Sequence, residues 1–211
     1  MLNSGNWFEL KSFNKEKSQP YDLFSLQKEI FEQINSREKN LEFINITFGK
    51  RYTRTELTDI EFHLTENQLK NFSNKMQSEK MHPIITFHGT SDPKTVESIF
   101  KSGYLIPGTG SVKKAHGSAY GNGIYSSPHF DKAIYYTKPD EIKTVYVLVN
   151  LVFLGRMKLI PPGGLGIDHV EPINGAYSDG TNTRIVYGLE QLVCADSSRI
   201  VPVGVMKIKV G

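Results

Sequence analysis

The spacing of apolar residues over the first eighty positions indicates helices and strands in turn. Residues 41–48 and 60–64 are predicted to form short strands, and a second helix is predicted over residues 66–76. We therefore expect residues 1–80 to form a helical and β extension that packs on a main body over residues 81–211. The first helix of this extension is predicted from an amphipathic stripe that comprises Leu23, Leu26, Ile30 and Ile34.

From residue 82 onward, short strands alternate with short helices. Residues 83–87 predict a strand, and Asp92 followed by Pro93 predicts the start of a helix that stops before Gly103. Because strands outnumber helices, we expect an α+β fold of two small, mainly antiparallel sheets with a central cleft. The pattern further predicts one helix over residues 130–137 and strands over residues 124–126, 144–154, 184–187, 189–194 and 200–209.

Two long segments between these elements are rich in turn-forming residues. One covers residues 104–120, and the other opens at Pro161 and runs through Asn182. A long ordered loop in a compact domain is usually functional, so we expect both segments to cover a ligand. The stretch from Pro161 to Gly166 is not a phosphate-binding P-loop, because the Lys-Ser/Thr pair and the following helix are missing.

Composition and charge narrow the classes of function. The chain has 211 residues, of which 38% are hydrophobic and 22% charged, as is typical of a folded globular domain. Its 25 basic and 22 acidic residues give a net charge of +3, which is too balanced to favour nucleic acid as a partner. We expect a monomer.

Cysteine use and the lack of long apolar runs bear on the cellular compartment. The lone Cys194 excludes an internal disulfide and a cysteine-based zinc site, and we expect it to be a small buried strand residue. No run approaches the roughly 20 apolar residues of a membrane helix, and the N-terminus lacks the order of a signal peptide. We therefore expect no membrane partner and a cytoplasmic location, either in the producing cell or in a target cell that receives the protein as a secreted effector.

Polar residues at the ends of two predicted strands are the candidate site. Ile84, Thr86 and His88 fall on one face of the first strand, and Gly89 lets a ligand approach the backbone closely. Tyr125 follows a glycine-rich turn and ends the second strand. Residues placed in this way form rigid walls beside a bound nucleotide.

These residues and their order resemble a known family. The matching features are His88-Gly89-Thr90 at a strand end, the helix that stops at Gly103, the Gly-x-Gly-Ile-Tyr run at 121–125, Tyr136 and Glu190. Together they resemble the catalytic domain of poly(ADP-ribose) polymerase-like ADP-ribosyltransferases with a His-Tyr-Glu triad. The resemblance covers roughly residues 82–210 and is closest to the compact versions of fungi, protists and bacteria. It implies an ADP-ribosyltransferase-like fold with NAD in the central cleft.

The resemblance also implies a role for each matched residue and no metal. Gly89 would pair its backbone with the nicotinamide carboxamide, and His88 would bind a ribose hydroxyl of the adenosine half. Tyr125 and Tyr136 would sandwich the nicotinamide ring, and Glu190 would stabilise the oxocarbenium-like centre. The implied catalytic residues are His88, Tyr125 and Glu190, and the implied NAD-binding residues are His88, Gly89, Thr90, Tyr125, Ser126, Ala133 and Tyr136.

Two departures from the family pattern shape the expected activity. Many members carry a serine between the two tyrosines, whereas this chain has Ala133, so its grip on nicotinamide would rest on Gly89 and ring stacking. The loop over residues 161–182 is short, which favours transfer of a single ADP-ribose unit to a protein side chain. The chain also lacks a Glu-x-Glu motif, which argues against arginine as the acceptor.

Several residues have a simpler interpretation. His88 alone could be satisfied by a backbone carbonyl, the tyrosines could be core residues, and Tyr135 competes with Tyr136 for the stacking role. Glu171 is a competing acid that we interpret as a solvated loop charge. The same simple interpretation applies to other loop residues, namely Lys113, Lys114 and His116.

Three other functions compete with protein ADP-ribosylation. NAD glycohydrolase activity would use water as the acceptor, and a catalytically silent module would bind NAD or ADP-ribose without needing Glu190. RNA 2′-phosphotransferase activity depends on several arginines and a second histidine motif. Because residues 81–211 hold only Arg156, Arg184 and Arg199, we rank this last function low.

Overall fold

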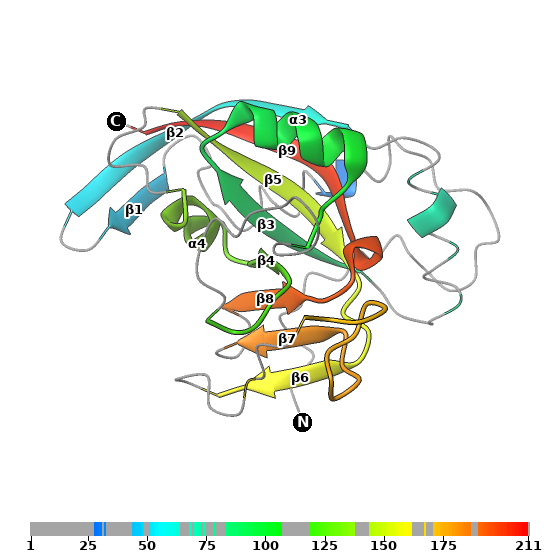
Figure 1. Ribbon diagram of the computed structural model, residues 1–211. Helices are drawn as coiled ribbons and strands as arrows, with labels where there is room; N and C mark the ends of the chain where they lie inside the picture. Colours follow the sequence, from blue (N-terminus) through cyan, green and yellow to red (C-terminus); the bar gives the residue numbers. More distant parts are fainter. Residues whose placement is uncertain are drawn as a thin grey trace.

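The protein folds into two β-sheets with short helices packed against them (Figure 1). The prediction of an α+β fold with two mainly antiparallel sheets is confirmed. The structure is a computed structural model. The residues it describes are 28–30, 32, 44–48, 51–63, 68, 70–72, 74, 78, 83–106, 119–137, 144–161, 167, 171–186 and 190–210.

The larger sheet is antiparallel throughout, with the strand order β1-β2-β9-β5-β3. β5 lies inside this sheet and is buried on both faces. Val147 and Val149 belong to one core cluster, and Leu148 to another on the opposite face. This explains why its sequence is a continuous apolar run without alternation. The strands are β1 (Ile44–Phe48), β2 (Arg51–Phe62), β3 (Ile84–Thr90), β5 (Thr144–Val152) and β9 (Ile200–Val210).

The smaller sheet has the order β4-β8-β7-β6, and β6 and β7 form its parallel pair. Phe87 of β3 and Ser127 exchange two backbone hydrogen bonds of 2.6 and 2.9 Å, which join the two sheets. This junction places the end of β3 beside the end of β4. The strands of the smaller sheet are β4 (Ile124–Ser126), β6 (Met157–Ile160), β7 (Thr183–Val186) and β8 (Gln191–Cys194).

Helices α3 (Pro93–Ser102) and α4 (Phe130–Tyr135) pack against the larger sheet. α3 begins as predicted, because the Asp92 side chain accepts a 2.9 Å hydrogen bond from the Lys94 N–H. It ends at Gly103, whose φ of 74° a residue with a side chain rarely adopts. α4 packs against β3 and β5 and buries its apolar face in the core.

Some predicted strand boundaries are wrong. β2 begins at Arg51 rather than at residue 60, because its polar side chains hide the alternation that marks a strand. β6 was not predicted, since four residues carry too short a pattern. Glu190 lies in the turn before β8 rather than within the strand.

The N-terminal predictions are covered only in part. Residues 28–30 and 32, and also 68, 70–72, 74 and 78, are helical. The rest of the two predicted helices, including Leu23, Leu26 and Ile34, lies outside the described residues. The domain boundary near residue 80 stays a prediction; β2 pairs with β9, so strands from both sides of that boundary share one sheet.

Candidate functional site

His88 and Tyr125 meet at the junction of the two sheets. His88 Nδ1 lies 2.7 Å from the backbone carbonyl oxygen of Tyr125. Because a carbonyl only accepts, Nδ1 carries the hydrogen, and this hydrogen bond fixes the imidazole tautomer. The His88 ring also packs edge-on against Tyr104, with the ring centroids 5.5 Å apart. The His88 ring is thus hydrogen-bonded to a backbone carbonyl, as its simpler interpretation predicts. That carbonyl is the one of Tyr125, which is itself a predicted site residue.

The Tyr125 phenol is held by the turn that precedes it. Its hydroxyl donates to the Gly121 carbonyl oxygen at 2.7 Å and accepts from the Tyr120 N–H at 3.1 Å. Burial raises the pKa of Tyr125, while the hydrogen bond from Tyr120 and the nearby Arg184 partly oppose that shift. The phenol therefore stays protonated at neutral pH, and its ring has a fixed orientation.

Gly89 and Ala133 are in direct contact. A Cβ atom at Gly89 would overlap the carbonyl oxygen of Ala133, so any side chain at position 89 would displace α4. The need for glycine here thus comes from helix packing. This contact places α4, with Lys132 and the tyrosines that follow, beside the end of β3.

Glu190 reaches the site through two contacts. Its backbone carbonyl accepts a 2.6 Å hydrogen bond from the Ser127 hydroxyl, two residues after Tyr125. Its carboxylate Oε2 lies 3.1 Å from Nζ of Lys132 on α4, and the Glu190 side chain is 51% exposed. Burial lowers the pKa of Lys132, but the hydrogen bond and charge of Glu190 outweigh it and leave the pKa raised. The acid therefore faces a cation and remains accessible to solvent.

Tyr136, rather than Tyr135, turns toward the Glu190 end of the site. Its hydroxyl accepts a hydrogen bond from the side-chain amide of Gln191, the residue after Glu190. Tyr135 packs edge-on against Tyr136, with centroids 5.5 Å apart. The role of Tyr136 as the second aromatic wall stays a prediction.

Two further predicted NAD-binding residues, Thr90 and Ser126, lie within regular structure. The Thr90 hydroxyl accepts a 3.2 Å hydrogen bond from the Asp92 N–H at the start of α3. Ser126 is buried in β4, and its hydroxyl has no hydrogen-bond partner among the described residues. Lys113, Lys114 and His116 lie outside the described residues.

Glu171 lies in a loop and is exposed, as its interpretation as a solvated loop charge requires, but one of its carboxylate oxygens also has a partner within the protein. Its Oε1 accepts a 2.9 Å hydrogen bond from the side-chain amide of Asn122, which is buried. A polar group that leaves water needs such a partner. The turn before Tyr125 is thus tied to the segment that contains Glu171.

Sequence reasoning missed Lys132, Arg184 and the turn at Asn174-Gly175. Lys132 carries no signal of its own, because its role depends on the fold that brings Glu190 to it. Arg184 is fully buried, stacks 3.7 Å from the centroid of the Tyr177 ring and donates to the Tyr120 carbonyl at 3.0 Å. The Asn-Gly dipeptide, in contrast, is a strong hairpin signal that could have been used.

Cys194 is buried in β8, as predicted. Burial raises the pKa of its thiol to about 11, so the thiol is not a nucleophile at neutral pH. Within the described ranges, no cluster of three or more metal-ligating side chains is found. The described helices also include none that is long and apolar enough to cross a membrane.

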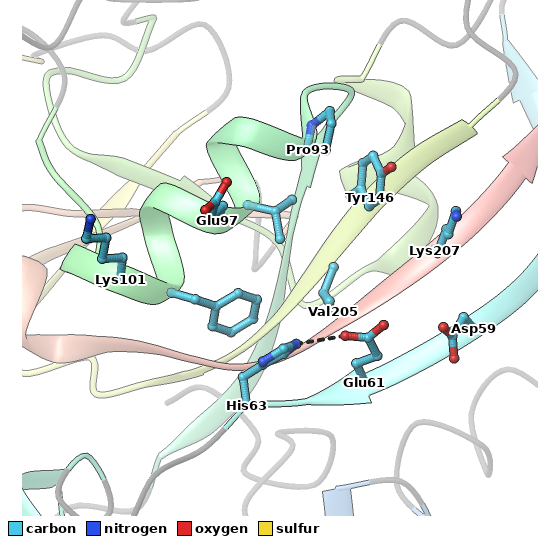
Figure 2. A pocket seen from close by; sticks show the side chains of 11 residues that line it. Asp59, Glu61, His63, Pro93, Glu97, Lys101, Tyr146, Val205 and Lys207 are labelled. Atoms are coloured by element: carbon cyan, nitrogen blue, oxygen red, sulfur yellow. Dashed lines mark hydrogen bonds and ion pairs between the residues drawn. The ribbon is translucent and has the colours of Figure 1, made fainter.

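A separate groove of about 610 Å³ lies between α3 and β2 (Figure 2). None of the predicted site residues lines it. Its floor includes Val205, and the ring of His63 stacks on Phe100 with centroids 4.3 Å apart. Both acids and bases line it, namely Asp59, Glu61, His63, Glu97, Lys101 and Lys207. Its charges are mixed, and it is distinct from the site at the sheet junction.

Comparisons with known proteins give a consistent result. Residues 39–173 match the family model described as the poly(ADP-ribose) polymerase catalytic domain. The chain is 26% identical over 123 residues to the poly [ADP-ribose] polymerase tankyrase of Caenorhabditis elegans, which is 58% of this chain but only 5% of that protein. The match to the family model ends before Glu190, so the assignment of the acid rests on its own surroundings.

The fold also resembles a solved structure. The PARP domain of Arabidopsis RADICAL-INDUCED CELL DEATH1 aligns with a TM-score of 0.55 and 14% identity. The alignment covers 90% of this chain and 99% of that one. At this identity the likeness shows the fold alone.

Proposed function

The chain belongs to the family of poly(ADP-ribose) polymerase catalytic domains, and from this premise we propose that it is an NAD-dependent enzyme that transfers one ADP-ribose unit to a protein side chain. The observation that supports the proposal is that His88 is hydrogen-bonded to the Tyr125 carbonyl, while the Glu190 carbonyl accepts a hydrogen bond from Ser127, two residues after Tyr125. These residues are far apart in sequence, and separate strands and turns bring them together.

The proposed chemistry needs few groups. The bond between the nicotinamide nitrogen and the anomeric carbon breaks, and its electron pair leaves with nicotinamide and neutralises the ring charge. A nucleophilic atom of the acceptor bonds to the anomeric carbon and releases its proton to solvent. Positive charge develops on the ribose in between, and the Glu190 carboxylate would stabilise it. One acid suffices because the leaving group is already cationic, unlike that of a glycosidase.

The neighbours of Glu190 support this role. Lys132 holds the carboxylate at 3.1 Å, so the acid has a defined position before NAD arrives. Tyr125 and Tyr136 would flank the nicotinamide ring, and Gly89 would pair its backbone with the carboxamide. Since Ala133 has no hydroxyl, we expect the grip on nicotinamide to be weaker than in relatives with serine there.

Transfer of a single unit to a protein is the finer part of the proposal. The short segment between β6 and β7 supports a single unit over a polymer. Gly188, two residues before Glu190, leaves the chain without a Glu-x-Glu motif, which disfavours arginine as the acceptor. We further propose a monomer that acts in a cytoplasm, of its own cell or of a target cell.

NAD hydrolysis is the second candidate, because the Glu190 side chain is half exposed and water can reach it. RNA 2′-phosphotransferase activity ranks lower, since Arg184 and Arg199 are buried. A silent NAD-binding module remains the outcome in which neither product forms.

One assay separates these functions. The protein is incubated with a cell lysate and NAD that is labelled in its ADP-ribose part. A labelled protein band with one added unit per site supports the proposal, free ADP-ribose indicates a hydrolase, and neither indicates a binding module. Loss of labelling in Glu190→Gln, with labelling kept in the matched control Glu97→Gln on α3, would assign the activity to this site.

A further inference from the structure

One side-chain pair fastens the turn before Tyr125 to a distant hairpin. The turn covers residues 119–123, and we call residues 171–178 the hairpin segment. Asn122 donates from its side-chain amide to Glu171 Oε1 at 2.9 Å, across 49 positions of sequence. Asn122 is 3% exposed, so its amide depends on partners within the protein.

The hairpin segment is held in place by its own turn and by a hydrogen bond to β8. Ile173 and Ala176 pair across a tight turn in which Asn174 and Gly175 have φ values of 50° and 74°, the conformation that an Asn-Gly turn favours. The segment is also anchored to β8, because the Tyr177 hydroxyl donates to the Val193 carbonyl at 3.2 Å. Glu171 is exposed and lies two residues before Ile173, the first paired residue of this anchored hairpin.

On the other side of the contact, the turn controls the Tyr125 ring. The Tyr125 hydroxyl is bonded to the backbone of Gly121 and Tyr120. Gly123 fits closely against the hairpin segment, because a Cβ atom there would lie 2.7 Å from the Tyr177 hydroxyl. A shift of the turn would thus move the phenol with it.

We propose that Glu171 is a positioning residue that holds the Tyr125 ring in place through Asn122. The inference rests on the proposed function, since Tyr125 matters to activity only as a wall of the nicotinamide site. The contact needs an acceptor oxygen at position 171 rather than a negative charge. Glutamine supplies that oxygen and alanine does not, and this difference separates a positioning role from an acid role.

The kinetic test compares Glu171→Ala, Glu171→Gln, Asn122→Ala and the double alanine variant. We expect Glu171→Ala and Asn122→Ala each to raise the KM for NAD about 10-fold with a smaller change in kcat, as loss of a charge-assisted hydrogen bond allows. Glu171→Gln should stay close to the parent protein. The double variant should be no worse than either single one, because both remove the same contact.

Two kinetic results would overturn the proposal. One is a Glu171→Gln variant as impaired as Glu171→Ala, with the loss in kcat, which would make Glu171 an acid in the reaction. The other is additive loss in the double variant. The matched control is Asp179→Ala. Asp179 lies next to the hairpin segment, but its carboxylate is bonded to Lys158 and Thr181. The KM of this variant for NAD should not change.

A second measurement does not depend on NAD. The Tyr120 N–H is bonded to the Tyr125 hydroxyl, so amide hydrogen exchange reports whether the turn is held. We expect faster exchange at residues 120–123 in Glu171→Ala but not in Glu171→Gln. Unchanged exchange in Glu171→Ala would overturn the proposal even if the protein never consumes NAD, while changed exchange without NAD turnover would refute only the proposed function.

Discussion

The edge of the site that holds Glu190 and the turn that holds Tyr125 lie on the same small sheet and differ in exposure. Glu190 and Lys132 form an ion pair whose side chains are 51% and 35% exposed. Arg184, by contrast, is fully buried beneath the turn and binds its backbone.

The exposed ion pair and the buried arginine are expected to have different roles, one in activity and the other in stability. An exposed ion pair contributes little to folding, so Glu190 and Lys132 can serve the proposed reaction without a large effect on stability. Arg184 stacks on Tyr177 and donates a hydrogen bond to the Tyr120 carbonyl, so this buried cation holds the turn that precedes Tyr125. Substitutions should therefore separate activity from stability at the exposed edge and couple them at the buried turn.

The largest expected effect is that of Glu190→Gln. We expect kcat/KM for ADP-ribosyl transfer to fall by about 1000-fold, as for the loss of other electrostatic stabilisers of a transition state. The free energy of unfolding should change by less than about 0.5 kcal/mol, because the side chain is exposed. Labelled-NAD kinetics and urea denaturation measure the two quantities. A large fall in the free energy of unfolding of Glu190→Gln would contradict the claim that the exposed edge contributes to activity but not to stability.

Arg184→Ala should lower stability and activity together. It removes the stacking on Tyr177 and the hydrogen bond to Tyr120, and it leaves a cavity. We expect the free energy of unfolding to fall by about 3 kcal/mol, in the range for large buried side chains. Urea denaturation followed by tyrosine fluorescence measures it. Arg156→Ala, at an exposed position, is the matched control; equal stability of the two variants would show that the buried turn is not structural.

Lys132→Gln should lower kcat by about 10-fold, the effect of roughly 1.4 kcal/mol, because the Glu190 carboxylate loses its orienting partner. Its thermal midpoint should stay the same, since the pair is exposed. Lys132→Arg should keep most of the activity. Because the pKa of Lys132 is raised, its ammonium group stays charged and paired with Glu190 from pH 6 to pH 9. The parent protein and Lys132→Arg should therefore have pH–activity profiles of the same shape over this range. A change of activity with pH that is present in the parent protein and absent from Lys132→Arg would contradict the proposed role of Lys132.

Ala133→Ser should have the smallest effect. A hydroxyl there would restore the contact that the family pattern implies for the nicotinamide carboxamide. We expect the KM for NAD to fall about 3-fold, as a neutral hydrogen bond allows. Steady-state kinetics over a range of NAD concentrations measures it. A raised KM would mean that the carboxamide does not lie beside α4.

Much of the fold followed from local pattern. The Asp92-Pro93 start of α3, its stop at Gly103 and the apolar run of β5 are local signals, and the structure agrees with each. The start of β2 was hidden by polar side chains, and β6 is too short to be periodic.

The sequence predicted a set of candidate site residues, whose roles stay predictions, but not the contacts that these residues make. Order and spacing brought His88, Tyr125 and Glu190 together through the family resemblance. No local pattern could reveal that Lys132 faces Glu190, or that Glu171 binds Asn122, because both pairs join segments about fifty positions apart. Glu171 is an exposed loop residue, as expected, but its contact with Asn122 could not be seen in the sequence.

A crystal structure with a non-hydrolysable NAD analogue tests the central claim most directly. The account predicts the nicotinamide ring between Tyr125 and Tyr136, with its ribose beside Glu190. An analogue bound instead in the groove between α3 and β2 (Figure 2), or a nicotinamide ring away from both tyrosines, would contradict it.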